Sequence, residues 1–362
     1  MSARSVLIMA GGTGGHVFPA LALARLLRRE SLEVVWLGTR KGLEARIVPA
    51  ENIPVEWIAI GGLRGKGILT LIAAPFGLSR ALWQSLRVMW RRRPLVVVGL
   101  GGFVTGPGGL AAWLTRRPLV IHEQNAVAGF TNRCLSHLAR EVLEAFPGSF
   151  GASSRARAIG NPVRSEIAAI VPPAERFAAR DGAIRILVIG GSQGAVKLNR
   201  TVPAALARAA KALTLRIRHQ AGERWIDSAR QSYTEAHVQA EVVPFIDDMA
   251  AAYAWADIVV CRAGALTISE LTAAGVGSIL VPFPAAVDDH QTRNARFLVE
   301  AGAALLIPES ELNAERLSDE LLRICADRSE PLRMASRARA LATPHAAQEL
   351  ARACLSSMRS AA

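Results

Sequence analysis

Residues 6–16 read VLIMAGGTGGH, a short apolar run that leads directly into a glycine-rich loop with a threonine and a histidine. A second stretch of the same plan, IRILVIGGSQG, occupies residues 184–194 in the other half of the chain. A helical pattern follows each of them. Because glycine lets a backbone approach a ligand closely and a helix N-terminus favours an anion, the two loops predict two nucleotide-fold domains that serve one phosphate-containing reaction.

Further apolar runs, each followed by a helical pattern, recur along the chain. They are rich in β-branched residues and are bounded by glycine or proline, as is typical of parallel strands buried on both faces. The runs are Val34–Gly38, Leu95–Gly99, Leu119–His122, Ile258–Cys261 and Ser278–Pro282. Their alternation with helices predicts an α/β fold with doubly wound parallel sheets.

The chain is long enough for two domains, because its 362 residues exceed the usual size of a single hydrophobic core. The stretch from Pro147 to Pro162 is rich in glycine and serine and has little periodicity, so we interpret it as a linker. It divides the chain into two halves with one glycine loop each. We place the two domains at residues 1–161 and 162–342.

The net charge of +13 is carried mostly by arginine, which suits phosphates or an anionic lipid surface. Nucleic acid is the other obvious partner, but only 5% of the residues are aromatic and no nucleic-acid-binding motif is present. The four cysteines form no CxxC pair and no histidine cluster accompanies them, which predicts reduced thiols without a metal. The chain also contains no Asp-x-Asp sequence, so a metal site of that kind has little support.

His16 closes the first glycine loop and falls in the first turn of the expected helix. The helix dipole disfavours a positive charge there, so we expect a neutral imidazole, which is the form that a general base requires. The alternative is a histidine that only caps or packs the helix. For the loop itself, the corresponding alternative is a tight strand-to-helix turn without any ligand.

Two further loops are expected at the same edge of the first sheet. Residues 99–109 contain a second glycine cluster after one apolar run, and His122–Asn125 follow the next run. Ligands of open α/β sheets bind at the carboxyl ends of the strands, so these loops belong near the first one. The polar residues 122–125 either bind a sugar or solvate a loop, and Glu123 is the fallback candidate for the base.

In the second half, a polar stretch from Arg262 to Glu270 follows the apolar run that ends at Cys261. Two interpretations compete for Glu270. It is either the partner of Thr267 in a capping box, or a ligand for a ribose at a helix whose N-terminus holds phosphates. Gln291, on the loop after the next run, carries an amide that suits sugar hydroxyls, although surface loops are often this polar.

Residues 80–93 form a basic amphipathic pattern. The apolar face is predicted to consist of Leu82, Leu86, Met89 and Trp90. A basic helix with tryptophans suits an anionic membrane surface, and the alternative is an ordinary helix packed on the sheet. The apolar segment before it is shorter than the ~20 residues that a spanning helix needs, so it favours contact with a membrane over crossing. The candidate membrane patch consists of Ile72, Phe76, Leu78, Arg80, Trp83 and Arg87.

A series of short motifs occurs in order over nearly the whole chain. The N-terminal half carries GGTGGHVFPA at 11–20, GGLRGKG at 61–67 and HEQN at 122–125. The C-terminal half carries GNPVR at 160–164, GGSQGA at 190–195, FIDDM at 245–249 and ALTISE at 265–270. This series closely resembles the MurG family of bacterial lipid II-forming N-acetylglucosaminyltransferases. Val196 departs from the pattern, since many relatives carry arginine at that position.

The resemblance implies a GT-B fold, in which two Rossmann-like doubly wound domains face a cleft and the C-terminal helix, residues 343–362, returns to the N-terminal domain. It implies inverting transfer of GlcNAc from UDP-GlcNAc to the 4-hydroxyl of the MurNAc of lipid I. The product, lipid II, serves peptidoglycan synthesis, and thereby cell-wall biogenesis, cell shape and cell division. It also implies that no cofactor is required. The implied partners are both substrates, an anionic membrane surface and other cell-wall synthesis proteins, at the cytoplasmic face of the bacterial inner membrane.

The resemblance also implies roles for single residues. Ile246 would contact the uracil through its backbone, and Glu270 the ribose. Asn125 and Gln291 would bind the GlcNAc. The other implied donor residues, which hold the diphosphate or lie near the donor sugar, are Thr13, Gly14, Gly15, Arg164, Ser192, Ala265, Leu266, Thr267, Ile268 and Ser269. The residues implied for the acceptor pyrophosphate are Gly11, Gly12, Gly102 and Gly106.

Two alternative functions stay open. A UDP-GlcNAc 2-epimerase shares the two-domain architecture, but it needs no lipid acceptor, so the segment from Ile68 to Trp90 argues against it. A non-catalytic nucleotide-sugar or lipid-pyrophosphate binding protein is the other class, and no lost loop favours it.

Overall fold

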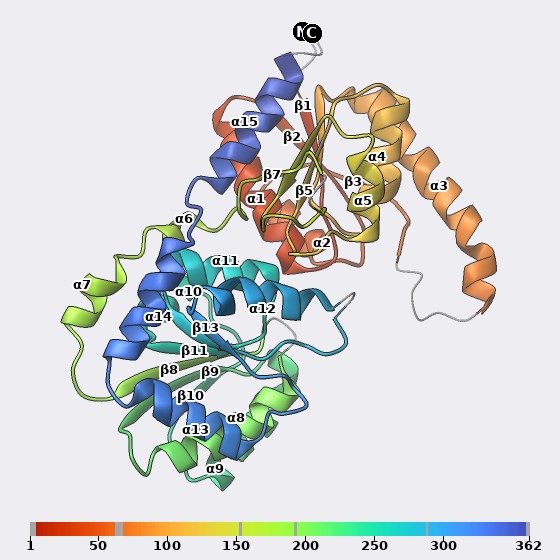
Figure 1. Cartoon of the computed structure of the whole chain (residues 1–362). Helices are drawn as coiled ribbons and strands as arrows, with labels where there is room; N and C mark the ends of the chain where they lie inside the picture. The colour runs from red at the N-terminus through yellow and green to blue at the C-terminus, as the bar shows by residue number, and fades with distance from the viewer. Residues whose placement is uncertain (1–4, 62–67, 152–153, 192–193, 287–288, 360–362) are drawn as a thin grey trace. The chain divides into compact units, whose positions relative to one another are not determined.

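The computed structural model describes residues 5–61, 68–151, 154–191, 194–286 and 289–359, and the side chains of residues 68–73 lie outside that description. The chain forms two compact units (Figure 1). The first consists of Met1–Arg164 and Pro344–Ala362, and the second of Ser165–Thr343. The chain therefore passes from one unit to the other twice.

The first unit is built on a parallel sheet with the strand order β3-β2-β1-β4-β5-β6-β7. The strands are β1 (Ser5–Met9), β2 (Glu33–Gly38), β3 (Val55–Trp57), β4 (Val96–Gly99), β5 (Leu119–Glu123), β6 (Glu141–Glu144) and β7 (Arg157–Ala158). The central strands β1, β4 and β5 are buried along their whole length, because helices cover both faces of the sheet.

Two hydrophobic clusters, one on each face, join the helices of the first unit to its sheet. The helices are α1 (Gly14–Arg29), α2 (Glu44–Ala50), α3 (Ile68–Arg92), α4 (Thr105–Leu114), α5 (Phe130–Ser136) and α15 (Ala346–Arg359). The last of these comes from the C-terminal end of the chain and packs beside α1 (Figure 1). Its Leu350 and Cys354 are fully buried in the same cluster as Leu23 and Leu27 of α1.

The second unit repeats the plan with the strand order β10-β9-β8-β11-β12-β13, again with parallel pairs throughout. Its strands are β8 (Ile184–Ile189), β9 (Leu215–Gln220), β10 (Glu241–Val243), β11 (Ile258–Cys261), β12 (Gly277–Leu280) and β13 (Ala304–Leu306). Its helices are α6 (Ser165–Ala168), α7 (Pro173–Ala178), α8 (Val196–Ala209), η1 (Glu223–Trp225), α9 (Ile226–Glu235), α10 (Met249–Trp255), α11 (Ala265–Ala274), α12 (His290–Glu300), α13 (Ala314–Cys325) and α14 (Ser329–Ala340). The predicted α/β fold with two doubly wound parallel sheets is confirmed.

In both sheets the order of the strands reverses beside the first strand. β1 pairs with β2 on one side and β4 on the other, and β8 likewise lies between β9 and β11. Ligands of doubly wound sheets bind at this reversal, outside the carboxyl ends of the strands. The loops after β1 and β4, and those after β8 and β11, are therefore the places where a site is expected in each unit.

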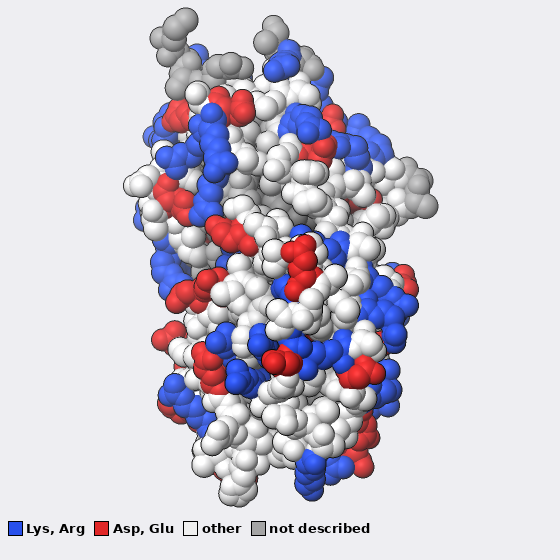
Figure 2. Space-filling model, turned by 90° about the vertical axis from the view of Figure 1, so that its left-hand side faces the viewer, with Lys and Arg blue, Asp and Glu red and all other residues white. Residues whose placement is uncertain are grey.

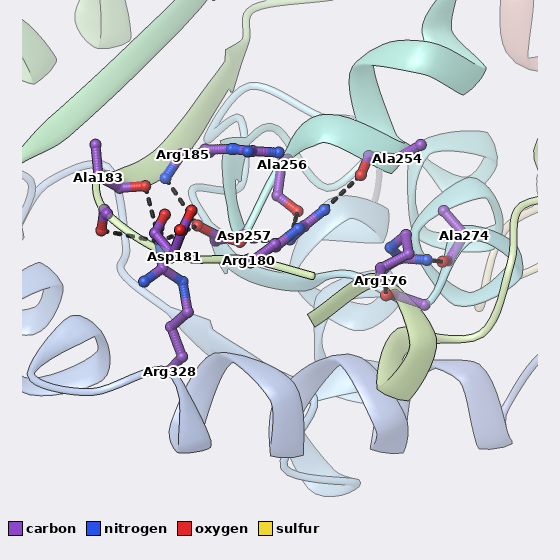
Figure 3. Close-up of polar contacts among 12 residues, drawn as sticks. Arg176, Arg180, Asp181, Ala183, Arg185, Ala254, Ala256, Asp257, Ala274 and Arg328 are labelled. Atoms are coloured by element: carbon purple, nitrogen blue, oxygen red, sulfur yellow. Dashed lines mark hydrogen bonds and ion pairs between the residues drawn. The ribbon is translucent and has the colours of Figure 1, made fainter. Parts of the chain in front are cut away.

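The segment that leads into β8 is held by a buried ion pair (Figure 3). The side chains of Arg180 and Asp257 are only 3% and 0% exposed, and Arg180 also donates to two backbone carbonyls at the end of α10. The second oxygen of Asp257 accepts the N–H of Arg185 at 2.9 Å and lies 3.7 Å from Arg328. Burial lowers the pKa of Arg180, and the charge of Asp257 opposes that shift. The negative charge of Asp257 thus compensates the positive charges of the arginines around it.

Basic side chains do not form a continuous area on the face that Figure 2 shows. Lys and Arg are mixed there with Asp and Glu over both units. Local ion pairs account for part of the surface charge in the first unit, where Arg157 and Arg352 both contact Glu349 of α15. Such exposed pairs contribute little to stability, and their effect is to break up the positive potential.

Candidate functional site

His16 is the third residue of α1, directly after the turn from β1. Gly12 has a φ of +92° and the N-cap Thr13 is extended, so the chain enters the helix abruptly. Nδ1 of His16 lies 3.2 Å from the carbonyl oxygen of Gly11. Since a carbonyl only accepts, this hydrogen bond places a proton on Nδ1 and leaves Nε2 of the neutral ring as the basic nitrogen.

The loop after β4 packs against the same histidine. Gly101 and Gly102 have φ values of +102° and +83°, which other residues rarely adopt. A Cβ at Gly101 would lie 2.8 Å from Nε2 of His16, and one at Gly102 would lie 2.4 Å from the carbonyl oxygen of Gly11. The structure therefore brings the two glycine loops of the first unit together around His16.

The glycines implied for the acceptor pyrophosphate have contacts of their own. Gly11 is buried, and a Cβ there would lie 2.7 Å from Oε1 of Glu44. The N–H of Gly12 donates to Oε2 of Glu44 at 2.9 Å. Gly106 lies in the first turn of α4, where a Cβ would meet Thr131 at 3.6 Å. Packing thus explains part of the glycine content, and the N-termini of α1 and α4 supply further backbone N–H groups for an anion.

Residues 122–125 span the end of β5 and the loop after it. His122 is fully buried: its Nε2 donates to the carbonyl oxygen of Gly160 at 2.9 Å, and its Nδ1 accepts from the amide of Gln124 at 3.1 Å. Burial lowers the pKa of His122 to about 4, so the ring stays neutral near pH 7. A loop that is merely solvated does not fit, because the first three of these residues are buried.

Glu123 is the fallback candidate for the base, and both oxygens of its carboxylate accept hydrogen bonds from within the protein. Oε1 accepts from the N–H and the side-chain amide of Asn125 at 3.0 and 3.1 Å. Oε2 accepts from the N–H of Gly129 at 3.2 Å and from the amide of Asn132 at 2.8 Å. Four donors hold this buried group in place. Glu123 therefore positions the loop that carries Asn125, the residue implied for the sugar.

In the second unit, α11 begins at Ala265 and has Gly264 as its N-cap. The capping-box interpretation is wrong, because Thr267 and Glu270 both lie inside the helix and no side chain caps it. Glu270 is buried, and its Oε2 accepts from the hydroxyl of Tyr253 on α10 at 3.1 Å. The first turns of α11, residues 265–270, thus follow β11 at the reversal of the sheet, where a helix N-terminus favours an anion.

Gln291, in the first turn of α12, lies beside the start of α11. Its Oε1 accepts from the N–H of Ala263 at 3.3 Å and from that of Phe283 at 2.9 Å, which fixes the orientation of the side-chain amide. Ile246 is half-buried between β10 and α10. Arg164 is the last residue of the first stretch of the first unit. Ser192 lies outside the described residues.

The inner face of α3 packs on the first sheet. Leu82, Leu86 and Met89 join the hydrophobic cluster there, and Met89 is fully buried. The prediction that Trp90 shares this face is wrong, because Trp90 is 59% exposed. At about 100° per residue it lies about 80° from Leu82, at the edge of the apolar stripe.

The outer face of α3 carries a row in which aromatic and basic residues alternate at helical spacing. The row consists of Phe76, Arg80, Trp83, Arg87 and Trp90. Phe76 and Trp83 are 80% and 55% exposed, and the guanidinium of Arg87 lies 5.8 Å from the centre of the Trp83 ring. Leu78 is also exposed. Ile72 lies on α3, but its side chain is outside the described part of the chain.

Two features have no sequence motif that points to them. Glu44 is fully buried against the first glycine loop, and the only signal in its neighbourhood is the pair Gly38 and Gly42. Trp113 and Leu114, at the end of α4, are exposed apolar residues, and α4 packs on α3. They enlarge the apolar surface of the first unit beyond the patch expected from the sequence.

Within the described ranges, no group of three or more His, Cys, Asp or Glu side chains is arranged to hold a metal ion. Asp248 instead caps α10, where its Oδ1 accepts from the N–H of Ala251 at 2.9 Å. Among the same residues, no helix combines the length and apolar character that crossing a membrane requires.

Two family profiles match the chain, one in each half of the sequence. The glycosyltransferase family 28 N-terminal domain matches residues 6–144, and the glycosyltransferase family 28 C-terminal domain matches residues 185–350. The chain belongs to glycosyltransferase family 28. The two glycine loops that follow β1 and β8 thus open the two domains of a family 28 protein.

Named relatives of this family 28 chain match it over almost their whole length. Proteins of Alkalilimnicola ehrlichii and Nitrosococcus oceani are 57% and 58% identical, covering 98% and 97% of this chain and 99% and 98% of theirs. Both are named UDP-N-acetylglucosamine–N-acetylmuramyl-(pentapeptide) pyrophosphoryl-undecaprenol N-acetylglucosamine transferase. The crystal structure of Acinetobacter baumannii MurG superimposes with a TM-score of 0.85 at 42% identity, covering 98% of this chain and 99% of that one.

A UDP-GlcNAc 2-epimerase from Neisseria meningitidis also superimposes, with a TM-score of 0.67 over 97% of this family 28 chain and all of the other. Its sequence identity is only 12%, so the likeness concerns the fold alone. Glycosyltransferases such as CalG4, at 18% identity and a TM-score of 0.68, share the same two-domain fold. The predicted GT-B architecture is confirmed.

Proposed function

We propose that this family 28 glycosyltransferase transfers GlcNAc from UDP-GlcNAc to the 4-hydroxyl of the MurNAc of lipid I, with inversion at the anomeric carbon, to form lipid II. The observation that carries the proposal is the identity of 57% and 58% with two proteins that bear the name of this transferase. Both matches extend over nearly the whole of each chain, so both domains and the connections between them are included.

The roles of the two domains follow from their loops. We assign the acceptor to the domain formed by residues 1–161 with the helix at 343–362, and the donor to the domain formed by residues 162–342. The donor residues proposed for the diphosphate are Arg164, Ser192 and the first turn of α11, Ala265–Thr267. Glu270 binds the ribose, and the backbone of Ile246 binds the uracil. Helix N-termini and arginine suit this task because the diphosphate gains charge as it leaves.

The transfer is a single displacement. As the 4-hydroxyl oxygen of the acceptor attacks C1 of GlcNAc, its proton moves to Nε2 of His16 and the bond between C1 and the UDP oxygen breaks. Attack and departure occur on opposite faces of C1, so the configuration inverts. Gln291 and Asn125 orient the sugar, and the N-terminal glycine loops hold the pyrophosphate of the acceptor.

The proposal is tested by incubating the protein with UDP-GlcNAc and a soluble lipid I analogue. Release of UDP that depends on the acceptor, together with a product one GlcNAc heavier than the analogue, is the expected result. Formation of UDP-ManNAc without acceptor would show a 2-epimerase instead. Binding of UDP-GlcNAc without either product would identify a non-catalytic binding protein.

Replacing Glu270 with alanine is expected to weaken UDP binding by about 10- to 100-fold, because a hydrogen bond to a charged group contributes about 1.5–3 kcal/mol. Isothermal titration calorimetry with UDP measures the change. Tyr253→Phe is the matched control, since it removes the hydroxyl that contacts Glu270 but keeps the carboxylate. A lower melting temperature with unchanged UDP affinity in Glu270→Ala would assign Glu270 to the contact between α10 and α11 alone.

We further propose that the outer face of α3 binds an anionic membrane surface. Aromatic rings at the interface and arginines between them are the combination that such a surface selects. We accordingly propose a peripheral location at the cytoplasmic face of the bacterial inner membrane. Other cell-wall synthesis proteins are proposed partners there, in support of cell shape and division.

The double variant Phe76→Ser, Trp83→Ser is expected to lower partitioning onto vesicles that contain phosphatidylglycerol by at least about tenfold, because burial of one such side chain contributes about 1.5–3 kcal/mol. Sedimentation of the protein with vesicles measures it. Val171→Ser, which removes an exposed apolar side chain from the second unit, is the control. Unchanged partitioning of the double variant would exclude this face of α3.

A further inference from the structure

A buried carboxylate lies one peptide group away from His16. Glu44, the first residue of α2, is fully buried. Its Oε2 accepts from the N–H of Gly12 at 2.9 Å, and its Oε1 accepts from the N–H and the hydroxyl of Thr39 at 3.0 and 2.8 Å. The N–H of Gly12 belongs to the same peptide group as the carbonyl of Gly11, which accepts from Nδ1 of His16 at 3.2 Å. Glu44, this peptide and His16 thus form one continuous chain of hydrogen bonds.

The surroundings of Glu44 are built to admit its carboxylate. A Cβ at Gly11 would lie 2.7 Å from Oε1, one at Gly42 would lie 1.9 Å from Oε2, and one at Gly38 would lie 2.9 Å from Cγ. These distances are shorter than a Cβ tolerates, so any other residue at these three positions would displace the carboxylate. Gly11 and Gly42, from two loops, and Gly38, at the end of β2, therefore leave room for a single buried side chain.

The peptide between Glu44 and His16 is also held from its other sides. The indole N–H of Trp36, which is fully buried, donates to the carbonyl of Ala10 at 2.8 Å, one peptide earlier. Gly102 packs against the carbonyl oxygen of Gly11, as described above. With its N–H fixed by Glu44, the Gly11–Gly12 peptide keeps its carbonyl directed at the imidazole.

We propose that Glu44 is a positioning residue for the transfer reaction: it fixes the Gly11–Gly12 peptide, whose carbonyl keeps a proton on Nδ1 of His16 and so reserves Nε2 for the acceptor proton. The inference rests on the function proposed above. Hydrogen bonds in a chain polarise one another, so the charge of Glu44 strengthens the carbonyl as an acceptor when the imidazolium forms. A carboxylate does the same directly in a Ser-His-Asp triad, and here a peptide group stands between. No proton leaves or reaches Glu44.

The first test uses the protein without substrates. In ¹⁵N-histidine-labelled protein, the nitrogen shifts of His16 report which ring nitrogen carries the proton, and the His16→Ala spectrum assigns the signals. Glu44→Gln keeps the shape of the side chain but presents an NH₂ group to the N–H of Gly12 or to Thr39. A shift of His16 from the Nδ1–H form toward the Nε2–H form is expected. An unchanged tautomer would overturn the proposal, whatever the activity.

The second test separates positioning from general stability. Thr39→Val removes one hydrogen bond from the same carboxylate without touching Gly12, so it is the matched control. With the lipid I analogue varied at saturating UDP-GlcNAc, Glu44→Gln is expected to lower kcat on the order of 10²-fold with little change in the KM for the analogue, whereas Thr39→Val stays near the wild type. Equal losses of kcat in the two variants would overturn the proposal by showing a structural role only.

If Glu44→Gln does not fold, Glu44→Asp takes its place, because its shorter side chain keeps the charge but draws the carboxylate back from the N–H of Gly12. The same shift in tautomer and the same loss of kcat are then expected, and their absence would overturn the proposal. A failed transfer assay with the wild-type protein would contradict the proposed function and would leave the tautomer result standing by itself.

Discussion

Replacing His16 with alanine is expected to lower kcat by about 10²–10⁴-fold, the usual contribution of a general base. His16 has the geometry that a general base requires. The hydrogen bond from Nδ1 to the carbonyl of Gly11 leaves Nε2 as the basic nitrogen, and Nε2 lies on the side of the ring that the loop after β4 lines. Steady-state release of UDP at saturating donor and acceptor measures the change. UDP affinity should stay within twofold, because the proposed nucleotide contacts lie in the second half of the chain.

His137→Ala is the control for this variant, since His137 is exposed at the end of α5 in the same unit. Near-normal turnover of His16→Ala would exclude His16 as the base. Glu123 would then be a poor replacement, because its four internal hydrogen bonds would have to break before it could accept a proton from a substrate. A loss of activity in a Glu123 variant is therefore expected together with a lower melting temperature.

Asp257→Ala is expected to lower the free energy of unfolding of the second unit by about 3–5 kcal/mol, the usual cost of leaving a buried charge without its partner. The loss would leave Arg180 buried beside Arg185 and Arg328, and the N–H of Arg185 would lose its acceptor. Burial already lowers the pKa of Arg180, and removing the opposing carboxylate lowers it further. Equilibrium unfolding in urea, followed by tryptophan fluorescence and circular dichroism, measures the effect.

Asp319→Ala is the matched control, because Asp319 is exposed on α13 of the same unit, and it should change the free energy by no more than about 0.5 kcal/mol. A loss below about 1 kcal/mol in Asp257→Ala would contradict the expectation and indicate that water reaches Arg180. UDP affinity measured well below the unfolding transition should stay unchanged, since the ion pair lies at the amino end of β8 and β11 and not at the carboxyl ends.

The central strands are readable from sequence because burial on both faces removes polar residues from them. The run Val34–Gly38 falls within β2, and Ile258–Cys261 coincides with β11. The edge strands are different: β3, β10 and β13 have only three residues each and are partly exposed, and β7 has two exposed residues. Their pattern is too short and too polar to stand out, and pairing with a neighbour decides their conformation.

The residues of the candidate site likewise divide into those that the sequence locates and those that it does not. The glycine loops and the start of α11 are local features, so their positions follow from the chain itself. The partner of a carboxylate is not local: Glu44 contacts Gly12 across 32 positions. Spacing likewise places Glu270 three residues after Thr267 but not opposite Tyr253, 17 positions earlier. Trp90 on α3 shows a similar limit of sequence reasoning. A residue at the edge of the apolar stripe of a helix faces either the core or the solvent, and helical spacing does not decide which.

Helix α15 has a consequence for the order in which the protein acquires its structure during synthesis. The core of the first unit includes Leu350 and Cys354, which leave the ribosome after the whole of the second unit. The second unit, residues 165–343, is continuous and has its complete sheet available earlier. The part of the chain that is made first is therefore the part that is finished last, and a nascent chain halted before α15 presents the apolar surface of α1 to chaperones and proteases.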